Sequence, residues 1–195
     1  MSTSNNSNKT ARDRILKAAR ELFQQRGYFA VGTAEILTLA KAPKGSMYHH
    51  FPEGKEQIAI AAVEIIREEF LLYVSELRER QLSATEILKK LAKDMAVWCK
   101  KSKWQQGTML ASTAVGSVPG LPKLQAAIKN SFDAWRKIIV EILVEEGWRK
   151  TEAKSMATTI LSAMEGAMLL ARIDKDEKVI VSVINNLCLM LDIKN

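Results

Sequence analysis

Residues 33–51 constrain the fold most, because two short helical patterns here flank a single proline. Thr33 is placed to cap the first pattern. Apolar residues then recur at helical spacing as Ile36, Leu37 and Ala40. Pro43 disfavours helix at Ala42, yet proline is well suited to open the next helix. We therefore expect a first helix that ends by about Lys41 and a second that begins directly after the proline.

The second helix, from about Lys44 to His50, divides its side chains between two faces. Met47 and Phe51, four residues apart, lie on one side. The remaining surface carries polar side chains, namely Lys44, Ser46, Tyr48, His49 and His50. A helix-turn-helix needs this division, since one helix braces a second whose outer residues reach base edges in the major groove. Helical pairs with a proline turn also occur in all-α proteins that bind no DNA, so both interpretations stay open.

Side-chain chemistry and charge favour the DNA-binding interpretation. Gly45 lets the backbone approach DNA closely, Lys44 is a cation for phosphate or guanine, and Tyr48 and His49 can donate to phosphate oxygens. Residues 1–55 contain nine basic and four acidic residues, so they carry +5 of the chain's total charge of +7. A basic segment that coincides with a helix-turn-helix is expected of a protein that binds the phosphate backbone. A solvated basic face is the alternative.

Ordered motifs extend this pattern over residues 10–58. They are Ile15, Leu16, Ala19, Leu22 and Phe23 in a first helix, then Gly27-Tyr28-Phe29, Thr33, Lys44 to Phe51, and Lys55-Glu56. This set resembles the N-terminal domain of TetR-family transcriptional regulators. Residues 42–57, together with 162–167 and 169–172, are most similar to the LmrA/YxaF-like subgroup of that family. The resemblance therefore covers most of the chain.

The resemblance implies that seven residues contact operator DNA: Thr33, Lys44, Gly45, Ser46, Tyr48, His49 and Lys55. His50 is expected to pack or cap instead. The family usually places glycine where this chain has Lys41, and a positive φ would cost a residue with a side chain roughly 1 kcal/mol. We therefore expect the turn to be built differently here.

Long helical periodicities and scarce β-branched alternation predict an all-α chain. We expect a polar, disordered tail over residues 1–9, a three-helix helix-turn-helix domain over 10–54, and a larger helical effector-binding and dimerisation domain over 55–195. No stretch of about 18 uncharged apolar residues is present, so no membrane span is expected. Cys99 and Cys188 lack the spacing of a disulfide framework or metal site, which indicates a reducing cytoplasm.

Local signals place several helix ends. Thr10 with Asp13, and Ser83 with Glu86, are typical capping boxes, the second for a helix that runs to about residue 100. Between them we expect one long amphipathic helix from residue 55 to about residue 80, which could link the two domains. The segment 116–122 is rich in glycine and proline and is predicted to be a loop.

Two heptad-like seams follow that loop. One consists of Leu124, Ile128, Ser131, Trp135, Ile138 and Ile142, and the other of Ala153, Ala157, Ile160, Met164, Ala167 and Ala171. Two such helices could pair with their symmetry mates in a four-helix interface. Packing within one chain is the alternative. The resemblance favours a homodimer, whose two recognition helices would meet successive major grooves of a palindromic site.

A further set of large apolar side chains could line a ligand cavity. We predict Met95, Trp98, Met109, Phe132, Trp135 and Met164, because polarisable and aromatic groups suit an adaptable apolar site. Asp94, Asp133 or Glu165 could orient a polar effector if they point inward. Each of these side chains has the alternative of an ordinary core or surface role.

The combined hypothesis is a cytoplasmic homodimeric repressor that a small apolar or aromatic effector releases from double-stranded operator DNA. A constitutive DNA-binding protein without an effector is the alternative, distinguished by a filled core. No nucleophile elbow, phosphate loop or dinucleotide fingerprint is present, so an enzyme is not expected. We expect no catalytic residue, metal site or cofactor, and the adjacent His49 and His50 cannot easily share a metal.

Overall fold

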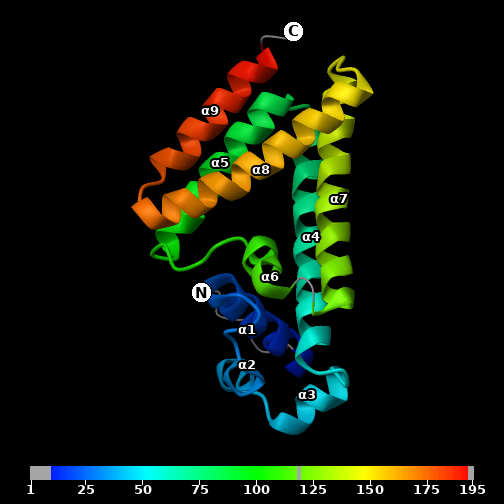
Figure 1. Cartoon of the computed structure of the whole chain (residues 1–195), viewed down its shortest axis with the longest axis vertical. Helices are drawn as coiled ribbons and strands as arrows, with labels where there is room; N and C mark the ends of the chain where they lie inside the picture. The colour runs from blue at the N-terminus through cyan, green and yellow to red at the C-terminus, as the bar shows by residue number, and fades with distance from the viewer. Residues whose placement is uncertain (1–9, 118–119, 193–195) are drawn as a thin grey trace, which may run out of the picture. The chain divides into compact units, whose positions relative to one another are not determined.

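The computed structural model describes residues 10–117 and 120–192, and within these ranges the chain is helical with no strand. The predicted all-α fold is therefore confirmed. The helices are α1 (Ala11–Arg26), α2 (Thr33–Ala40), α3 (Lys44–His50), α4 (Lys55–Glu79), α5 (Ala84–Lys101), α6 (Met109–Ser117), α7 (Pro122–Glu145), α8 (Lys150–Asp174) and α9 (Lys178–Asp192) (Figure 1). The predicted tail over residues 1–9 lies outside the described ranges, as do Val118 and Pro119 of the predicted loop.

These helices form two compact units that do not follow chain order. Unit 1 holds the chain up to Ile65 together with Met109–Ile128, and unit 2 holds Ile66–Thr108 together with the chain from Lys129 onward. The sequence predicted a division at residue 54. Unit 1 therefore includes α6 and the first turns of α4 and α7, which were expected to belong to the larger domain.

Unit 1 is built around α1, which packs against α2, α3 and α6. Its largest fully buried side chains include Ile15, Phe23, Ile36, Met47, Phe51 and Ile58. Met47 and Phe51 are 2% and 1% exposed, so the apolar side of the recognition helix faces this core as predicted. Because α3 has seven residues, this packing, rather than its own helix propensity, must hold it in place.

Two helix starts follow the predicted capping boxes, whereas the cap predicted at Thr33 is not formed. Thr10 accepts from the backbone N–H of Asp13, and Ser83 accepts from that of Glu86, as expected. Thr33 was expected to cap α2, but it is the first residue within that helix, and Gly32 is the N-cap. Glu35 performs the capping instead, since its carboxylate accepts from the Gly32 N–H at 3.1 Å.

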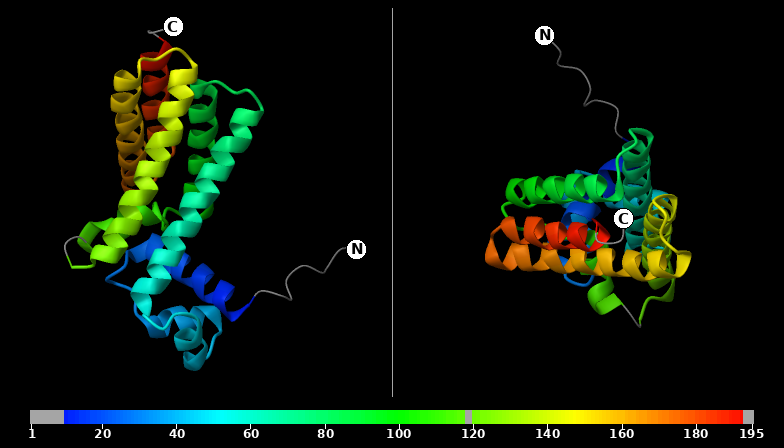
Figure 2. Two further views of the ribbon diagram at one scale, coloured as in Figure 1. Left: turned by 90° about the vertical axis from the view of Figure 1, so that its right-hand side faces the viewer. Right: turned by 90° about the horizontal axis from the view of Figure 1, so that it is seen from above.

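Unit 2 combines the second half of α4 with α5, α8, α9 and most of α7. Arg78 of α4 pairs with Glu145 of α7 at 2.5 Å, near the C-terminal ends of both helices. Helix α5 lies beside both α8 and α9 (Figure 2). The Cys188 thiol donates to the Thr85 carbonyl at 3.7 Å, while Lys100 pairs with Glu177, so α5 and α9 run antiparallel.

The two heptad-like seams pack inside the chain rather than at a dimer interface. Every seam residue is at most 8% exposed, including Trp135 at 7% and Met164 at 8%. The prediction that these seams pair between subunits is therefore wrong, because their side chains are already buried within the chain. Exposed apolar side chains occur elsewhere on the last two helices, as Leu169, Leu170 and Ile173 of α8 and Val181, Leu189 and Met190 of α9.

Helix α8 is long and apolar enough, by length and composition, to cross a membrane. Eight of its residues are buried, among them Ala153, Ala157 and Ile160. Packing into the core of unit 2 accounts for this composition without a bilayer, because core helices of globular proteins have the same apolar content.

Candidate nucleic-acid interface

The turn between α2 and α3 is built on a left-handed lysine. Lys41 has φ 49° and ψ 47°, and its N–H donates to the carbonyls of Leu37 and Thr38. The Ala42 N–H also donates to the Leu37 carbonyl, at 3.0 Å. Pro43, at φ −69°, then serves as the N-cap of α3. The expectation of a differently built turn is therefore wrong, since the chain accepts the strain of a positive φ without glycine.

Lys41→Gly is expected to stabilise the fold by about 0.5 kcal/mol, because relief of left-handed strain exceeds the extra entropy that glycine loses on folding. Lys41→Ala removes the same charge but keeps a Cβ, so it should give no gain. Chemical denaturation of both variants and the parent measures the difference. Equal stabilities of the two variants would show that the backbone at this position is not strained.

The outer surface of α3 presents the predicted contact residues to solvent. Lys44, Gly45, Tyr48 and His49 are exposed, with Tyr48 at 54%, while Ser46 is half-buried. A Cβ added at Gly45 would have no atom within 4 Å. The protein itself therefore leaves open space at this glycine. His50 is half-buried, and its ring lies 4.8 Å from that of His49.

A groove of ≈580 Å³ runs between α2 and α3. We call it the α2–α3 groove, and it is lined by Thr33, Ala34, Leu37, Thr38, Lys41, Ala42, Pro43, Lys44 and Met47. Two cations and two hydroxyl groups thus border an open hollow beside the exposed face of the recognition helix. Lys41, Lys44 and Thr33 offer the donors that a phosphate oxygen requires, whereas the Thr38 hydroxyl already donates to the Ala34 carbonyl at 2.9 Å.

Two exposed arginines of unit 1 also pair within the protein and position the helix-turn-helix. The Arg14 side chain donates from Nε to the Ala40 carbonyl at 3.2 Å, which satisfies the C-terminal end of α2. Arg26 pairs with Glu35 and holds the pKa of that carboxyl below its usual value. Sequence reasoning counted both arginines toward the charge facing DNA. It missed their positioning role, because neither pairing follows helical spacing.

Lys55 also has protein partners. Its Nζ donates to the carbonyls of Tyr28 and Val31, at 3.1 Å each, and lies 4.0 Å from the centre of the Tyr28 ring. Burial lowers the pKa of this ammonium group. Lys55 thus fixes the connection between α1 and α2. The DNA contact that the resemblance implies for it stays a prediction.

The C-terminal end of α1 docks closely on α6. Ser112 donates from its hydroxyl to the Phe23 carbonyl at 2.9 Å. Gly27 adopts φ 73°, and a Cβ there would lie 2.6 Å from the Ser112 carbonyl oxygen. Only glycine fits this approach, so the Gly27-Tyr28-Phe29 motif is explained by backbone contact within unit 1.

The six predicted ligand residues are divided between the two units. Met109 belongs to unit 1, where it is buried, whereas the other five belong to unit 2. An apolar cavity in unit 2 is lined by Phe70, Val74, Ala84, Ile87, Leu88, Leu91, Ile139, Ile142, Leu143, Ile160 and Met164. Met164 is the only predicted residue in this lining. The cavity volume is ≈20 Å³, which is about the space that one water molecule requires.

The remaining predicted aromatic residues of unit 2 have partners of their own. Trp135 lies 4.5 Å from Phe70 and 5.7 Å from Phe132, as measured between ring centres. The Trp98 indole donates to the Gln106 side chain at 3.0 Å. Met95 packs against the core as a half-buried side chain. Spacing along the helices revealed that these residues face inward, but it could not show which of them meet.

The three carboxylates considered for a polar effector differ in environment. Asp94 pairs with Lys90 at 2.5 Å and accepts from the Tyr73 hydroxyl, and Asp133 pairs with Lys129 and Arg136. Glu165 is the most enclosed, and the Thr108 hydroxyl donates to it. Burial raises the pKa of Glu165 above the usual 4.5.

Glu165 should therefore make the stability of the protein depend on pH. A carboxyl whose pKa is higher in the folded state favours folding below the pKa of the unfolded chain, and this contribution is lost as pH rises through the folded-state pKa. We expect Glu165→Gln to be more stable than the parent at pH 8, with the gap closing toward pH 4. Denaturation curves of both proteins between pH 4 and pH 8 test this prediction. A stability difference that does not change with pH would contradict the raised pKa of Glu165.

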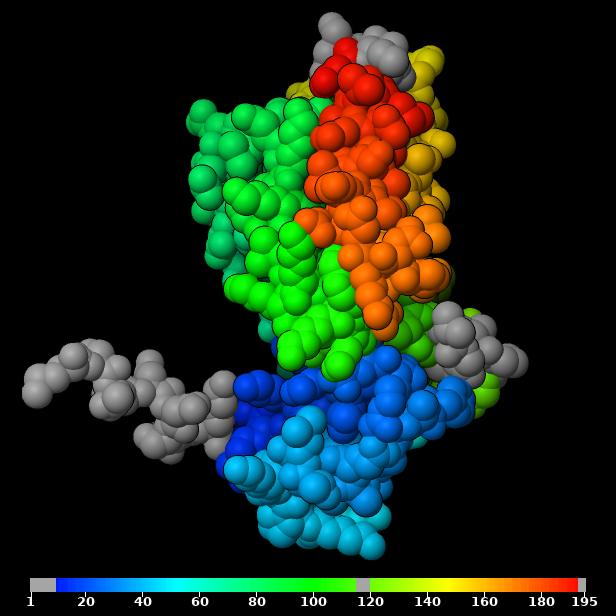
Figure 3. All heavy atoms as spheres, turned by 90° about the vertical axis from the view of Figure 1, so that its left-hand side faces the viewer, coloured from blue at the N-terminus to red at the C-terminus, as the bar shows by residue number. Residues whose placement is uncertain are grey.

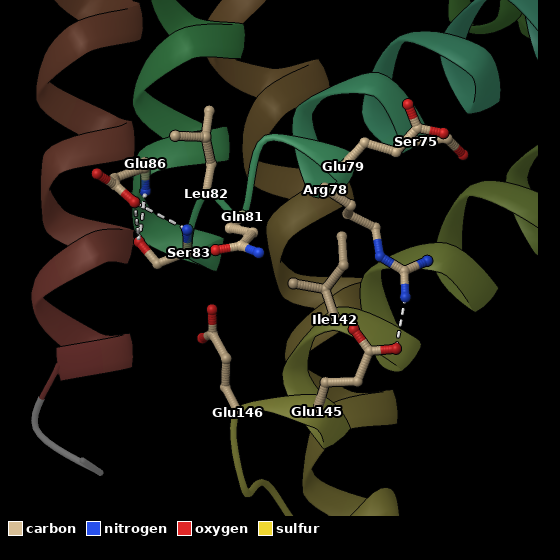
Figure 4. Close-up of a pocket in the computed structure, with 10 residues that line it drawn as sticks. All are labelled: Ser75, Arg78, Glu79, Gln81, Leu82, Ser83, Glu86, Ile142, Glu145 and Glu146. Atoms are coloured by element: carbon tan, nitrogen blue, oxygen red, sulfur yellow. Dashed lines mark hydrogen bonds and ion pairs between the residues drawn. The ribbon is translucent and has the colours of Figure 1, made fainter.

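A second groove, of ≈720 Å³, lies in unit 2 where α4 and α7 end and α5 begins (Figure 4). Its lining is polar: Glu145 pairs with Arg78, Glu86 accepts from the Ser83 N–H at 2.8 Å, and Glu146 accepts from the Ala84 N–H at 2.5 Å. These carboxylates secure helix ends. None of the six predicted ligand residues lines this groove, so it does not match the predicted apolar site.

Comparison with known proteins agrees with this geometry. Residues 15–62 match the family model of bacterial regulatory proteins of the tetR family, and residues 84–186 match that of the LmrA/YxaF-like transcriptional regulator C-terminal domain. The HTH-type transcriptional regulator LmrA of Bacillus subtilis is 32% identical over 83% of this chain and 86% of its own length. The uncharacterised regulator YxaF of the same species is 32% identical over 86% of this chain and 87% of its own.

A solved structure shares the fold at lower sequence identity. The TetR transcriptional regulator from Legionella pneumophila has a TM-score of 0.85 at 24% identity, and the match covers 95% of this chain and 99% of that one. The family models, the relatives that align over most of the chain and the shared fold thus agree with the helix-turn-helix geometry of unit 1. The chain belongs to the TetR family of transcriptional regulators, with an LmrA/YxaF-like C-terminal domain.

Proposed function

We propose that this protein is a homodimeric repressor that binds a palindromic operator through the exposed face of α3. The observation that carries the proposal is the pairing of a buried Met47–Phe51 side with an outer face of exposed Lys44, Gly45, Tyr48 and His49. The α2–α3 groove adds Thr33 and Lys41 beside this face. These side chains provide cations, hydroxyl donors and an unobstructed backbone, which is what phosphate and base contacts require.

The dimer interface is proposed on Leu169, Leu170 and Ile173 of α8 together with Leu189 and Met190 of α9. Leu169, Leu170 and Ile173 are 55%, 50% and 66% exposed, and they lie within two helical turns. Exposed large apolar groups clustered in this way mark surfaces that another protein covers. A second copy satisfies the two-fold symmetry of a palindromic site.

The effector step of the proposal rests on the apolar cavity of unit 2. Its lining is aliphatic and aromatic, which suits a small apolar molecule, but a volume of ≈20 Å³ does not hold one. An effector therefore has to favour a conformer in which this cavity is larger, and its differential affinity for that conformer drives release. We place the coupling in α4, which, like α7, contributes residues to both units.

The small volume of this cavity is also consistent with the alternative function. A constitutive DNA-binding protein has no need of an opened cavity, and the ≈20 Å³ volume favours it. The two functions differ in one measurement, which is operator affinity at increasing concentrations of apolar and aromatic compounds. A compound that weakens operator binding supports effector control, and affinity unchanged by compounds shown to bind the protein supports constitutive binding.

Selection of duplexes from a random pool tests operator binding directly and defines the operator. Lys44→Ala and Tyr48→Phe should each weaken binding about tenfold, since each removes a donor to a charged phosphate. Lys44→Ala should also lower the salt slope of binding by about one, whereas Tyr48→Phe should not. Fluorescence anisotropy at several salt concentrations measures both quantities.

Lys137→Ala is the matched control, because Lys137 is an exposed lysine of α7 in unit 2. It removes one charge and should leave operator affinity nearly unchanged. Unfolding curves and sedimentation should be the same for all three variants and the parent. Failure of the pool to yield a preferred sequence, or normal affinity in both α3 variants, would refute the proposed interface.

A further inference from the structure

A groove between α5 and α9 has no part in the proposed operator or effector steps. Its volume is ≈330 Å³, within the range of small-molecule sites. We call it the α5–α9 groove, and its lining consists of Lys89, Ala92, Lys93, Ala96, Val97, Lys100, Glu177, Val181, Ile184 and Asn185. Both helices belong to unit 2, and they lie side by side on the face shown in Figure 3.

The charge of this groove is unbalanced toward positive. Lys89, Lys93 and Lys100 line it from α5, whereas Glu177 is its single acidic residue. Lys100 is neutralised by Glu177, because these two side chains form an ion pair between the helices. Glu86, one turn before Lys89, is already held by the Ser83 cap. Among the described residues, Lys89 and Lys93, one turn apart on the same face, form no ion pair, although Glu86 interacts with Lys89 and Asp94 with Lys93 through charge. They are therefore the two lysines of the lining that can pair with an incoming anion at one end of the groove.

The floor of the groove is apolar and partly open to solvent. Ala92, Ala96 and Ile184 are buried, while Val97 and Val181 are 44% and 41% exposed. The small side chains of α5 keep the groove open, and the two valines offer apolar surface from opposite sides. Lysine stems add further apolar surface along the rim, since only their ammonium ends need water.

We propose that the α5–α9 groove binds a soluble, single-chain organic anion. The carboxylate or sulfate group lies between the ammonium groups of Lys89 and Lys93, and the alkyl chain lies along Ala96, Val97 and Val181. Two lysines without an ion pair at one end of an apolar floor match a molecule with one charged end. Nucleic acid fits this site poorly, because its phosphates would face the valines as well as the lysines. The proposal holds whether or not the protein is released from DNA by an effector.

Decanoate is a suitable probe, tested by isothermal titration calorimetry on the full chain. We expect saturable binding with one site per chain, at concentrations below those at which the probe aggregates. Lys89→Gln with Lys93→Gln should weaken decanoate binding at least fivefold, since both ion pairs with the carboxylate are lost. Lys101→Gln with Lys103→Gln removes the same charge outside the groove and should leave the affinity unchanged.

Two further arms test the geometry. Val97→Asp places a negative charge on the floor and should abolish binding, and decanol, which has the chain without the charge, should bind at least fivefold more weakly than decanoate. Equal affinity in the Lys89/Lys93 variant and the parent overturns the proposal, because decanoate then binds elsewhere, such as the core cavity. An equal loss of affinity in both double variants would show that binding depends on net charge alone, and it would overturn the proposal. Binding to anionic vesicles without binding of free decanoate would also overturn the proposal and would assign the groove to a membrane surface.

Discussion

Gly45→Ala is expected to weaken operator binding at least tenfold while leaving the fold intact or slightly more stable. Gly45 lies near the start of α3, where alanine favours the helix by about 0.5 kcal/mol over glycine. A Cβ at this position would have no protein atom within 4 Å. The added methyl group therefore costs nothing inside the protein and meets only what approaches α3 from outside. Anisotropy titrations with the selected operator, paired with unfolding curves, measure the two opposite effects.

Gly120→Ala provides a control for this substitution. Gly120 also has open space around its Cβ position, but it lies in the connection that precedes α7. The operator affinity of the Gly120→Ala variant should equal that of the parent. Normal affinity of Gly45→Ala would mean that the backbone of α3 does not approach DNA closely, and the contacts would then have to come from the longer side chains alone.

Gly27→Ala is expected to cause the largest loss of folding stability, about 3 kcal/mol. The backbone at Gly27 has φ 73° and ψ 176°, a conformation that is essentially restricted to glycine and costs other residues about 1–3 kcal/mol. The Cβ would also lie 2.6 Å from the Ser112 carbonyl oxygen, which belongs to the α6 backbone and cannot rotate away. Chemical denaturation should show the loss. Hydrogen exchange should rise at the junction of α1 and α6.

Gly54→Ala separates the two causes of this loss. Gly54 has a similar φ of 75°, but its Cβ position has no atom within 4 Å. It should therefore cost only the backbone strain, about 1 kcal/mol. A Gly27→Ala variant no less stable than Gly54→Ala would show that α6 moves away from α1 at little cost. The close docking of these helices would then not be a constraint on unit 1.

The recognition segment could be predicted from sequence because its determinants are local. Pro43 both ends one helix and begins the next, and the spacing of Met47 and Phe51 identifies the buried side of α3. The resulting bounds of α3 match those of the structure. Lys41 shows where local reasoning failed, since the penalty for a left-handed lysine is real but smaller than what the surrounding packing of α1, α2 and α3 contributes.

Inward-facing positions were also predictable, but their partners were not. The seams on α7 and α8 were correctly identified as apolar stripes, and helical periodicity is the same whether a stripe packs within a chain or between two chains. Likewise, the sequence proposed Met109 and Met164 for the same ligand cavity without revealing that they belong to different units.

The sequence by itself thus determined the helical class, the helix-turn-helix, its exposed polar face and the family. These depend on periodicity, capping and turn chemistry within a few residues. Only the tertiary structure decided that Arg14, Arg26 and Lys55 position unit 1, that α6 packs with the DNA-binding helices, and that Lys89 and Lys93 lie over an apolar groove. Those features join residues far apart in the chain, and no local pattern specifies which distant surfaces meet.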